Sequence, residues 1–281
     1  MSTIVNTNNF LRWTDVPGLG PVDTTSAIPN GYIQDSSRCD YAPIFKHEEA
    51  TRFYINSIVG TYWIADTGIV LQMINSVTGA VTVANAGVLN TDVFVNPAGD
   101  DSYNFYAEVT LENTVPPGKY KLRIKGDTRT WLESNEVQVV AATDTDNLRG
   151  TALVTYRHDR YFYGIRYQAQ PTFTHQYRLH LNYIDQQEES EVNVYKEITT
   201  GARREYNISM DLLWTVETYY FDREAHSAAI VMFKHSDFKI NGKSYLAKDS
   251  YRIGGNPRSK GNKGSISLYD SEFATINRCN P

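Results

Sequence analysis

The chain of 281 residues is poor in cysteine and in long apolar runs, and each shortage excludes a class of protein. Its two cysteines, Cys39 and Cys279, stand near opposite ends, whereas a disulfide-stapled scaffold carries more of them in a far shorter chain. A zinc site would need a second close pair, so both are expected to be free thiols. No apolar run is long enough to cross a bilayer, and the N-terminus lacks the basic start and apolar core of a signal peptide. We therefore expect no membrane partner.

Positive charge is also in deficit, since the formal net charge is −5. A protein that grips DNA through its phosphates is normally basic, so specific or general nucleic-acid binding is not expected. A mildly acidic lumen past which DNA could slide stays open. What the chain has in abundance is tyrosine, with 20 residues. Tyrosine favours pleated, half-buried strands, and it also suits large contact surfaces.

The six histidines offer no catalytic set or metal pair. An acid follows two of them, at His158-Asp159 and His47-Glu48, but consecutive residues of a strand point to opposite faces. His226 and His235 are nine residues apart, which is not the spacing of two ligands on one helix face. No nucleophile motif and no Gly-rich phosphate loop occur. The sequence predicts no catalytic residue, no metal site and no cofactor.

The acidic residues define neither a catalytic pair nor a calcium site. A glycosidase needs a defined pair of carboxylates, and no spacing singles one out among Asp211, Glu217 and Glu224. The segments 144–147 and 100–101 have too few oxygen ligands at fixed offsets for a calcium loop. Both are interpreted as solvated turns.

Residues 1–40 are predicted to form an extended N-terminal arm, because they are rich in turn residues and poor in periodic pattern. Phe10, Leu11 and Trp13 are apolar residues without a core of their own. Two interpretations stay open: the arm docks on a neighbouring subunit, or it packs back on its own domain.

Residues 41–145 are predicted to form an immunoglobulin- or fibronectin-like β-sandwich. Short strands recur at near-regular spacing with turns between them. The expected strands are 53–59, 68–74, 80–84, 92–95, 103–111, 119–124 and 136–140. In the sixth, apolar residues alternate with Lys119, Lys121, Arg123 and Lys125, which predicts an exposed strand face; a polyanion site is the minor alternative.

Residues 146–281 are predicted to form a second β-rich domain of α+β type, joined by a polar linker at 142–147. A strand covers 172–183, an acidic loop follows at 185–191, and residues 206–214 alternate as a half-buried strand. The period then changes to that of a helix over 216–235, packed on an antiparallel sheet. A hairpin at 237–246 turns at Asn241-Gly242, because type I′ turns need positive φ at both positions. The fold class is therefore mainly β, with two β-sandwich-like domains.

A basic loop lies between the last two strands. Arg252, Arg258, Lys260 and Lys263 occur there with no acid between the first and the last. The favoured interpretation is a contact with an acidic segment of an adjacent subunit, such as 185–191. A plain solvated loop and a DNA contact are the alternatives.

The succession "AHSAAIVMFKHSDFKINGKSY", a polar loop and "SISLYDSEFATIN", preceded by "VPPGKYKLRIKGDTRTWLESNEVQVV", resembles the tail or neck structural proteins of crAss-like phages that infect Bacteroidota. The resemblance implies a non-enzymatic virion protein that forms a homo-oligomeric ring with neighbouring tail proteins. It would be assembled in the host cytoplasm and located in the virion tail. The expected subunit interface comprises Phe10, Leu11, Trp13, Arg258, Lys260 and Lys263.

Two rival functions stay open. Sandwich domains with exposed aromatic rings suit glycan or receptor binding, with Trp63 and Trp131 as candidates, although a buried tryptophan is the simpler role for each. An enzyme that degrades polysaccharide or cell wall is the second rival.

Overall fold

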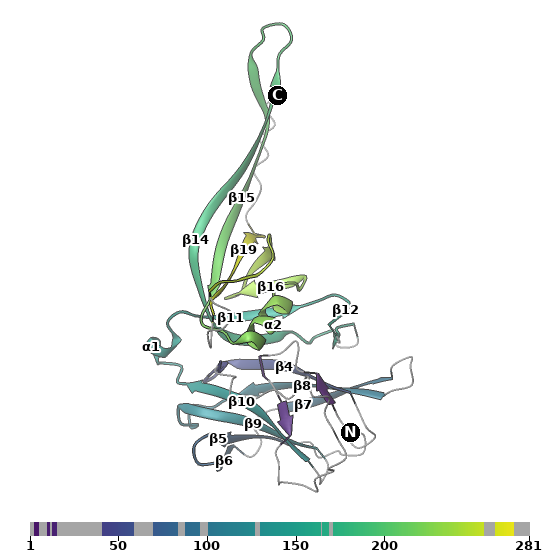
Figure 1. Ribbon diagram of the computed structural model, residues 1–281, viewed down its shortest axis with the longest axis vertical. Helices are drawn as coiled ribbons and strands as arrows, with labels where there is room; N and C mark the ends of the chain where they lie inside the picture. Colours follow the sequence, from purple (N-terminus) through teal and green to yellow (C-terminus); the bar gives the residue numbers. More distant parts are fainter. Residues whose placement is uncertain are drawn as a thin grey trace.

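The protein is mainly β, as predicted. The computed structural model describes residues 3–5, 10–11, 13–15, 41–58, 70–83, 88–95, 101–126, 130–163, 165–168, 171–255 and 262–272, some strand residues by backbone alone. Figure 1 shows three parts along the long axis: a layer of strands from the first half of the chain, a barrel, and a long hairpin that projects from the barrel.

Ten of the described strands come from the first half of the chain. They are β1 (Thr3–Val5), β2 (Trp13–Asp15), β3 (Ile44–Lys46), β4 (Ala50–Ile58), β5 (Val70–Asn75), β6 (Val81–Val83), β7 (Val88–Val95), β8 (Asp101–Thr110), β9 (Gly118–Gly126) and β10 (Thr130–Val140). Hydrogen bonds connect β1, β4, β8 and β7 in one series and β6, β5, β9 and β10 in another. The seven strands expected between residues 53 and 140 are thus confirmed, with shifted ends.

The basic face of β9 lies opposite the core, but the predicted exposure holds only in part: the side chain of Lys119 is 60% exposed, whereas those of Lys121 and Arg123 are 34% and 17% exposed. Tyr120 and Leu122 point into the core, whereas Lys121 and Arg123 reach Glu133 on β10 at 2.7 and 2.9 Å. Burial raises the pKa of Glu133, but the hydrogen bonds and charges of both cations outweigh it and hold that pKa below its usual value. These cations are partnered within their own sheet.

The second half of the chain closes a six-stranded antiparallel barrel. Its strands pair in the order β11 (Thr151–Arg157), β14 (His175–Lys196), β15 (Arg203–Thr218), β19 (Gly264–Asp270), β17 (Lys243–Ala247), β16 (Asp237–Ile240) and back to β11. The smaller elements are α1 (Thr145–Leu148), β12 (Tyr161–Phe162), β13 (Ile165–Arg166) and β18 (Arg252–Ile253). Asn241 and Gly242 have φ of 51° and 84°, so the predicted type I′ turn is confirmed.

Helix α2 (Arg223–Met232) follows β15 and is shorter than the predicted 216–235. The strand continues to Thr218, and the Asp222 side chain accepts hydrogen bonds from the amides of Glu224 and Ala225, which fixes the start of the helix. The expected apolar stripe is confirmed, since Ala225, Ala228, Ala229 and Met232 are buried. Figure 1 shows α2 at the end of the barrel that faces the first layer of strands.

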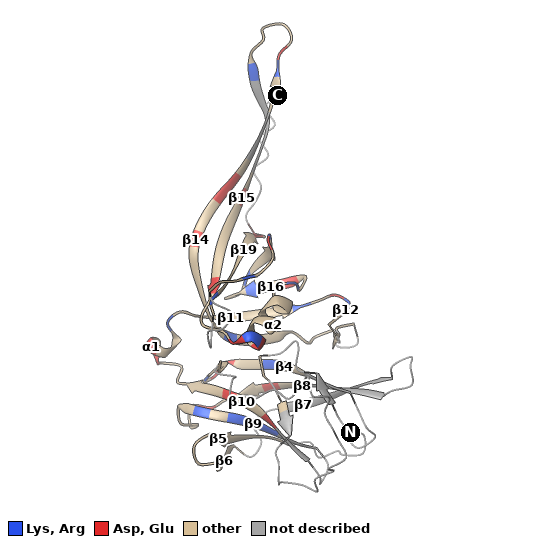
Figure 2. Ribbon diagram, in the orientation of Figure 1, with Lys and Arg blue, Asp and Glu red and all other residues tan. Residues whose placement is uncertain are grey.

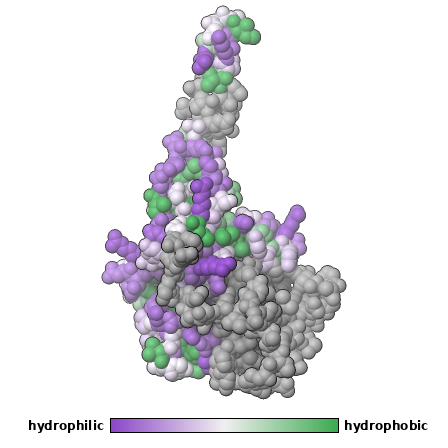
Figure 3. Space-filling view, in the orientation of Figure 1, coloured by the Kyte–Doolittle hydropathy of each residue, from purple (hydrophilic) through white to green (hydrophobic). Residues whose placement is uncertain are grey.

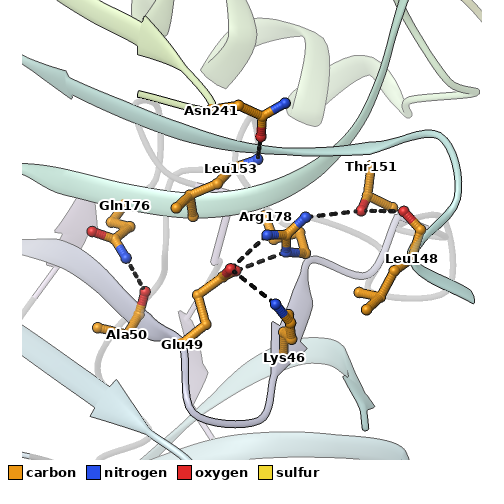
Figure 4. A network of polar contacts seen from close by, with 9 residues as sticks. All are labelled: Lys46, Glu49, Ala50, Leu148, Thr151, Leu153, Gln176, Arg178 and Asn241. Carbon is orange, nitrogen blue, oxygen red and sulfur yellow. Dashed lines mark hydrogen bonds and ion pairs between the residues drawn. The ribbon is translucent and has the colours of Figure 1, made fainter. Parts of the chain in front are cut away.

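A polar network joins the barrel to the first layer (Figure 4). The guanidinium of Arg178 on β14 donates to both carboxylate oxygens of Glu49, at 2.7 and 2.5 Å. Gln176 donates to the carbonyl of Ala50 at 2.6 Å. One hydrophobic core contains residues of both halves, from Phe10 through Leu268. The description as two β-sandwich-like domains is therefore not confirmed; the structure has a closed barrel with additional strands.

Candidate assembly surface

The most prominent surface feature is the hairpin of β14 and β15. The two strands pair from Leu181–Thr218 at the barrel to Lys196–Arg203 at the far end. The neighbouring strand β19 pairs with β15 only over residues 213–217, so beyond Leu212 no third strand of the described chain joins the hairpin. At about 3.3 Å per residue, the free part from Glu188 to Lys196 is roughly 27 Å long. Figure 1 shows it as a curved arm that rises from the barrel.

The expected acidic loop at 185–191 was wrong, because these residues belong to β14. A charged run indicates a loop only where a strand needs one apolar face. A two-stranded ribbon with solvent on both sides has no such requirement, so polarity alone does not predict its structure. The alternating pattern at 206–214 was a real strand signal; it marked β15, the partner of this acidic strand.

The tip of the hairpin is tightly closed and exposes apolar surface. The amide of Glu197 donates to the carbonyl of Ala202 at 2.8 Å, and Gly201 has a φ of 69° that a side chain rarely tolerates. Ile198 is fully exposed, and Val194 and Tyr195 are about half exposed. Figure 3 shows hydrophobic residues at the end of the projecting column. Burying an isoleucine side chain is worth about 1.5–3 kcal/mol, so this tip is suited to a partner.

Charge is separated along the same hairpin (Figure 2). Asp185, Glu188 and Glu189 lie on the barrel side, and Glu189 forms an ion pair with Lys248 at 2.5 Å. Lys196 and Arg203 lie opposite each other next to the tip, and both are exposed. The base of the hairpin is therefore acidic, and its end carries two exposed cations beside one carboxylate, that of Glu197, which accepts from the Thr200 hydroxyl at 2.5 Å.

The predicted interface residues of the N-terminal arm are buried within their own chain. Phe10, Leu11 and Trp13 are each at most 3% exposed. The ring of Phe10 lies 5.3 Å from that of Tyr177, and the ring of Trp13 lies 6.1 Å from that of Phe53. Of the two interpretations, the structure places these side chains in the core of their own subunit.

The basic loop is described only at its ends. Lys263 forms an ion pair with Glu217 of the same chain at 2.7 Å and lies over the ring of Tyr220. The hydrogen bond and charge of Glu217 raise the pKa of Lys263. Arg258 and Lys260 lie outside the described residues, as do Cys39, Cys279, Trp63 and the side chain of Trp131.

Several of the described histidines make structural contacts. His226 accepts a hydrogen bond from Tyr251 at 2.7 Å and donates to the carbonyl of Asn262 at 3.0 Å, which holds one end of the basic loop. Burial lowers the pKa of His226. Among the described residues, no group of three His, Cys, Asp or Glu side chains could hold a metal ion. The buried cluster around His175 and His235 could not be predicted, because the aromatic neighbours of a histidine come from distant parts of the chain.

Comparison with protein-family models and with curated proteins gives no match for this chain. Within the described part of the chain, neither helix has the length and apolar character needed to span a membrane. The surface geometry is therefore the basis for a functional proposal.

Proposed function

We propose that this protein is a non-enzymatic structural subunit that assembles with copies of itself into a ring, in the tail or neck of a phage. The observation that carries assembly is the free part of the hairpin. A two-stranded ribbon is marginally stable by itself in water, and its outer edges present unpaired backbone groups. A neighbouring copy that lies alongside would pair one of these edges.

The geometry of a hairpin suits repetition around an axis. Its two strands run in opposite directions, so the outer edge of β14 in one copy and that of β15 in the next would meet as an antiparallel pair. Each copy then uses two different edges, which is a heterologous contact that closes into a ring when the rotation closes. The assignment to a phage tail or neck, and with it a location in the virion beside other tail proteins, rests on the sequence resemblance.

Shortening the hairpin tests this proposal. Replacing residues 188–212 with Asn-Gly joins Gln187 to Leu213, which already face each other, through a type I′ turn. All pairings that close the barrel remain. We expect native mass spectrometry to show a closed oligomer for the unaltered protein and a monomer for the shortened one, with similar melting temperatures.

A matched control changes exposed apolar surface elsewhere. Val77 is 87% exposed in the turn between β5 and β6, so Val77→Ser should leave the oligomer intact. A monomeric unaltered protein at all concentrations would exclude the ring. A shortened protein that still closes the same oligomer would exclude the hairpin as its basis.

Glycan binding is the second candidate, favoured by one observation. A small open pocket on the outer face of the barrel is lined mainly by hydroxyl and charged side chains: Thr215, Ser250, Ser265, Ser267, Asp249 and Arg252. Such groups donate to and accept from sugar hydroxyls. Binding on a glycan array that Arg252→Ala abolishes would support this function over the structural one.

A further inference from the structure

The hairpin contains two cross-strand pairs of like charge, with opposite signs. Lys196 and Arg203 face each other at the end next to the tip, and Glu189 and Asp211 face each other nearer the barrel. Like charges directly opposite each other in an antiparallel pair destabilise it. A chain that only needed a stable ribbon would place opposite charges at these positions.

The two pairs cannot neutralise each other within one subunit. Glu189 and Lys196 are separated by seven residues on β14, which corresponds to roughly 23 Å in a strand. Within the described residues, neither Lys196 nor Arg203 forms an ion pair with any acid. The basic pair therefore has no ion-paired counter-charge within the described residues; the carboxylate of the adjacent Glu197 accepts from the Thr200 hydroxyl at 2.5 Å.

The acidic pair is only partly neutralised. Lys248 lies 2.5 Å from Glu189 and lowers the pKa of that carboxyl through a hydrogen bond. No ion pair among the described residues includes Asp211, and Glu188 adds an exposed carboxylate on the opposite face of the ribbon from Glu189. With Asp185, the base of the hairpin carries four carboxylates and one ion-paired lysine, Lys248, so it stays negative.

We propose that the basic pair of one copy docks on the acidic base of the hairpin in the next copy. This inference rests on the proposed function, because it names the contact by which copies recognise one another. The partner is a second copy of this chain, since each hairpin carries both halves of the charge complement. Neighbouring hairpins are consequently staggered along their length, which a closed ring permits when the hairpins are inclined to its axis. Without this stagger, acid would oppose acid.

Compensating charge reversal tests the contact. One variant reverses the end, with Lys196→Glu and Arg203→Glu. A second reverses the base, with Glu188→Lys and Asp211→Lys, and leaves Glu189 in place because it bonds Lys248. We expect each variant to raise the protein concentration at half-assembly by about tenfold or more in sedimentation velocity at low salt. A third variant combines all four changes and should return to within about threefold of the unaltered protein.

Recovery in the combined variant separates the proposal from a structural role, because the reversed pairs do not touch within one chain. A control exchanges the charges of the exposed pair Lys119 and Glu136 and should assemble normally. If the unaltered protein assembles and both reversed variants assemble equally well, the charge contact is wrong while the ring stands. If the unaltered protein stays a monomer, the ring and this contact both fail.

Discussion

A buried histidine without a hydrogen bond makes this fold sensitive to acid. His175 is 1% exposed, its ring stacks on Tyr156 at 4.5 Å, and neither ring nitrogen has a hydrogen-bond partner in the described chain. Burial lowers the pKa of His175 well below its usual range, and the nearby His235 adds to the effect. His235 donates from Nδ1 to the carbonyl of Val231 at 2.8 Å, so its Nε2 accepts from the Tyr167 hydroxyl.

Burial also lowers the pKa of His235 to about 4. An unfolded histidine titrates near 6.5, so between these values the unfolded chain binds more protons than the folded one. Stability is therefore complete above pH 6.5 and is lost as the pH falls towards 4. Each histidine that stays neutral in the fold contributes a slope of about 1.4 kcal/mol per pH unit in this window.

The first prediction concerns His175→Phe. A phenylalanine keeps the stacking on Tyr156 and removes the imidazole, which is neutral in the folded chain and takes up a proton on unfolding. We expect the free energy of unfolding at pH 7.5 to be unchanged or higher, and its decline between pH 6 and pH 5 to be shallower by about 1.4 kcal/mol per pH unit. Urea denaturation at three pH values measures both. Tyr156→Phe, in the same cluster, should keep the original slope; an equally steep slope in His175→Phe would disprove the assignment.

The conformation of an individual residue could be predicted from the sequence where it depends on its immediate neighbours alone. Positive φ at Asn241 and Gly242 follows from a requirement of the turn itself, and the structure has it. The burial of Phe10 and Trp13 could not be decided, because a terminal segment without periodicity gives no sign of which surface covers it. The contacts with Tyr177 and Phe53 that settle it are separated by long stretches of chain.

At the scale of elements, α2 depends on one buried cap. The carboxylate of Asp222 accepts from the amides of Glu224 and Ala225 at 3.0 and 2.8 Å, and from the amide of Tyr41 at 3.4 Å. The cap thus provides a hydrogen-bond acceptor for two backbone amides at the start of the helix, and it also holds the chain that leads into β3. These hydrogen bonds add to the burial of the apolar stripe of α2 on the barrel.

The second prediction is that Asp222→Ala lowers the free energy of unfolding by about 1–2 kcal/mol, whereas Asp222→Asn costs less because an amide oxygen can still cap. Denaturation at pH 7.5 measures the change. Asp144 provides a matched control, since it caps α1, an exposed helix of four residues, and accepts from the amide of Asn147 at 3.0 Å. Asp144→Ala should cost no more than about 0.5 kcal/mol; equal losses at both caps would contradict the argument.

Elements were predictable where one face is buried. The strands of the first half and the apolar stripe of α2 follow from periodicity, because the core selects alternating or helical spacing. Only one strand of the projecting hairpin could be predicted. Apolar and polar residues alternate in β15, whereas the projecting part of β14 is acidic and shows no such alternation. A strand that faces solvent on both sides lacks the pattern by which strands are recognised.

At the scale of the whole molecule, the barrel and the first layer of strands share one hydrophobic core, so we expect them to unfold together. One core cluster spans both, and the pair of Arg178 and Glu49 bridges them with both side chains about 14% exposed or less. The closure of the barrel could not be predicted from sequence patterns. Pairing of β11 with β16 joins residues about 80 positions apart, and local periodicity carries no information on such partners.

The last prediction tests the bridge with a double-mutant cycle. Glu49→Gln alone leaves the guanidinium of Arg178 without its carboxylate in a nearly buried site, so we expect a loss of about 2–3 kcal/mol in the free energy of unfolding. Arg178→Met should cost a similar amount, and the double variant should cost clearly less than the sum, with a coupling energy of about 1 kcal/mol or more. The exposed pair of Lys119 and Glu136 is the control, with side chains 60% and 40% exposed and an expected coupling below about 0.5 kcal/mol.

Coincident unfolding curves from tryptophan fluorescence and far-ultraviolet circular dichroism should accompany every variant, because the bridge and the core act on both halves together. Equal couplings for the two pairs, or two separate transitions in the unaltered protein, would show that the halves are independent.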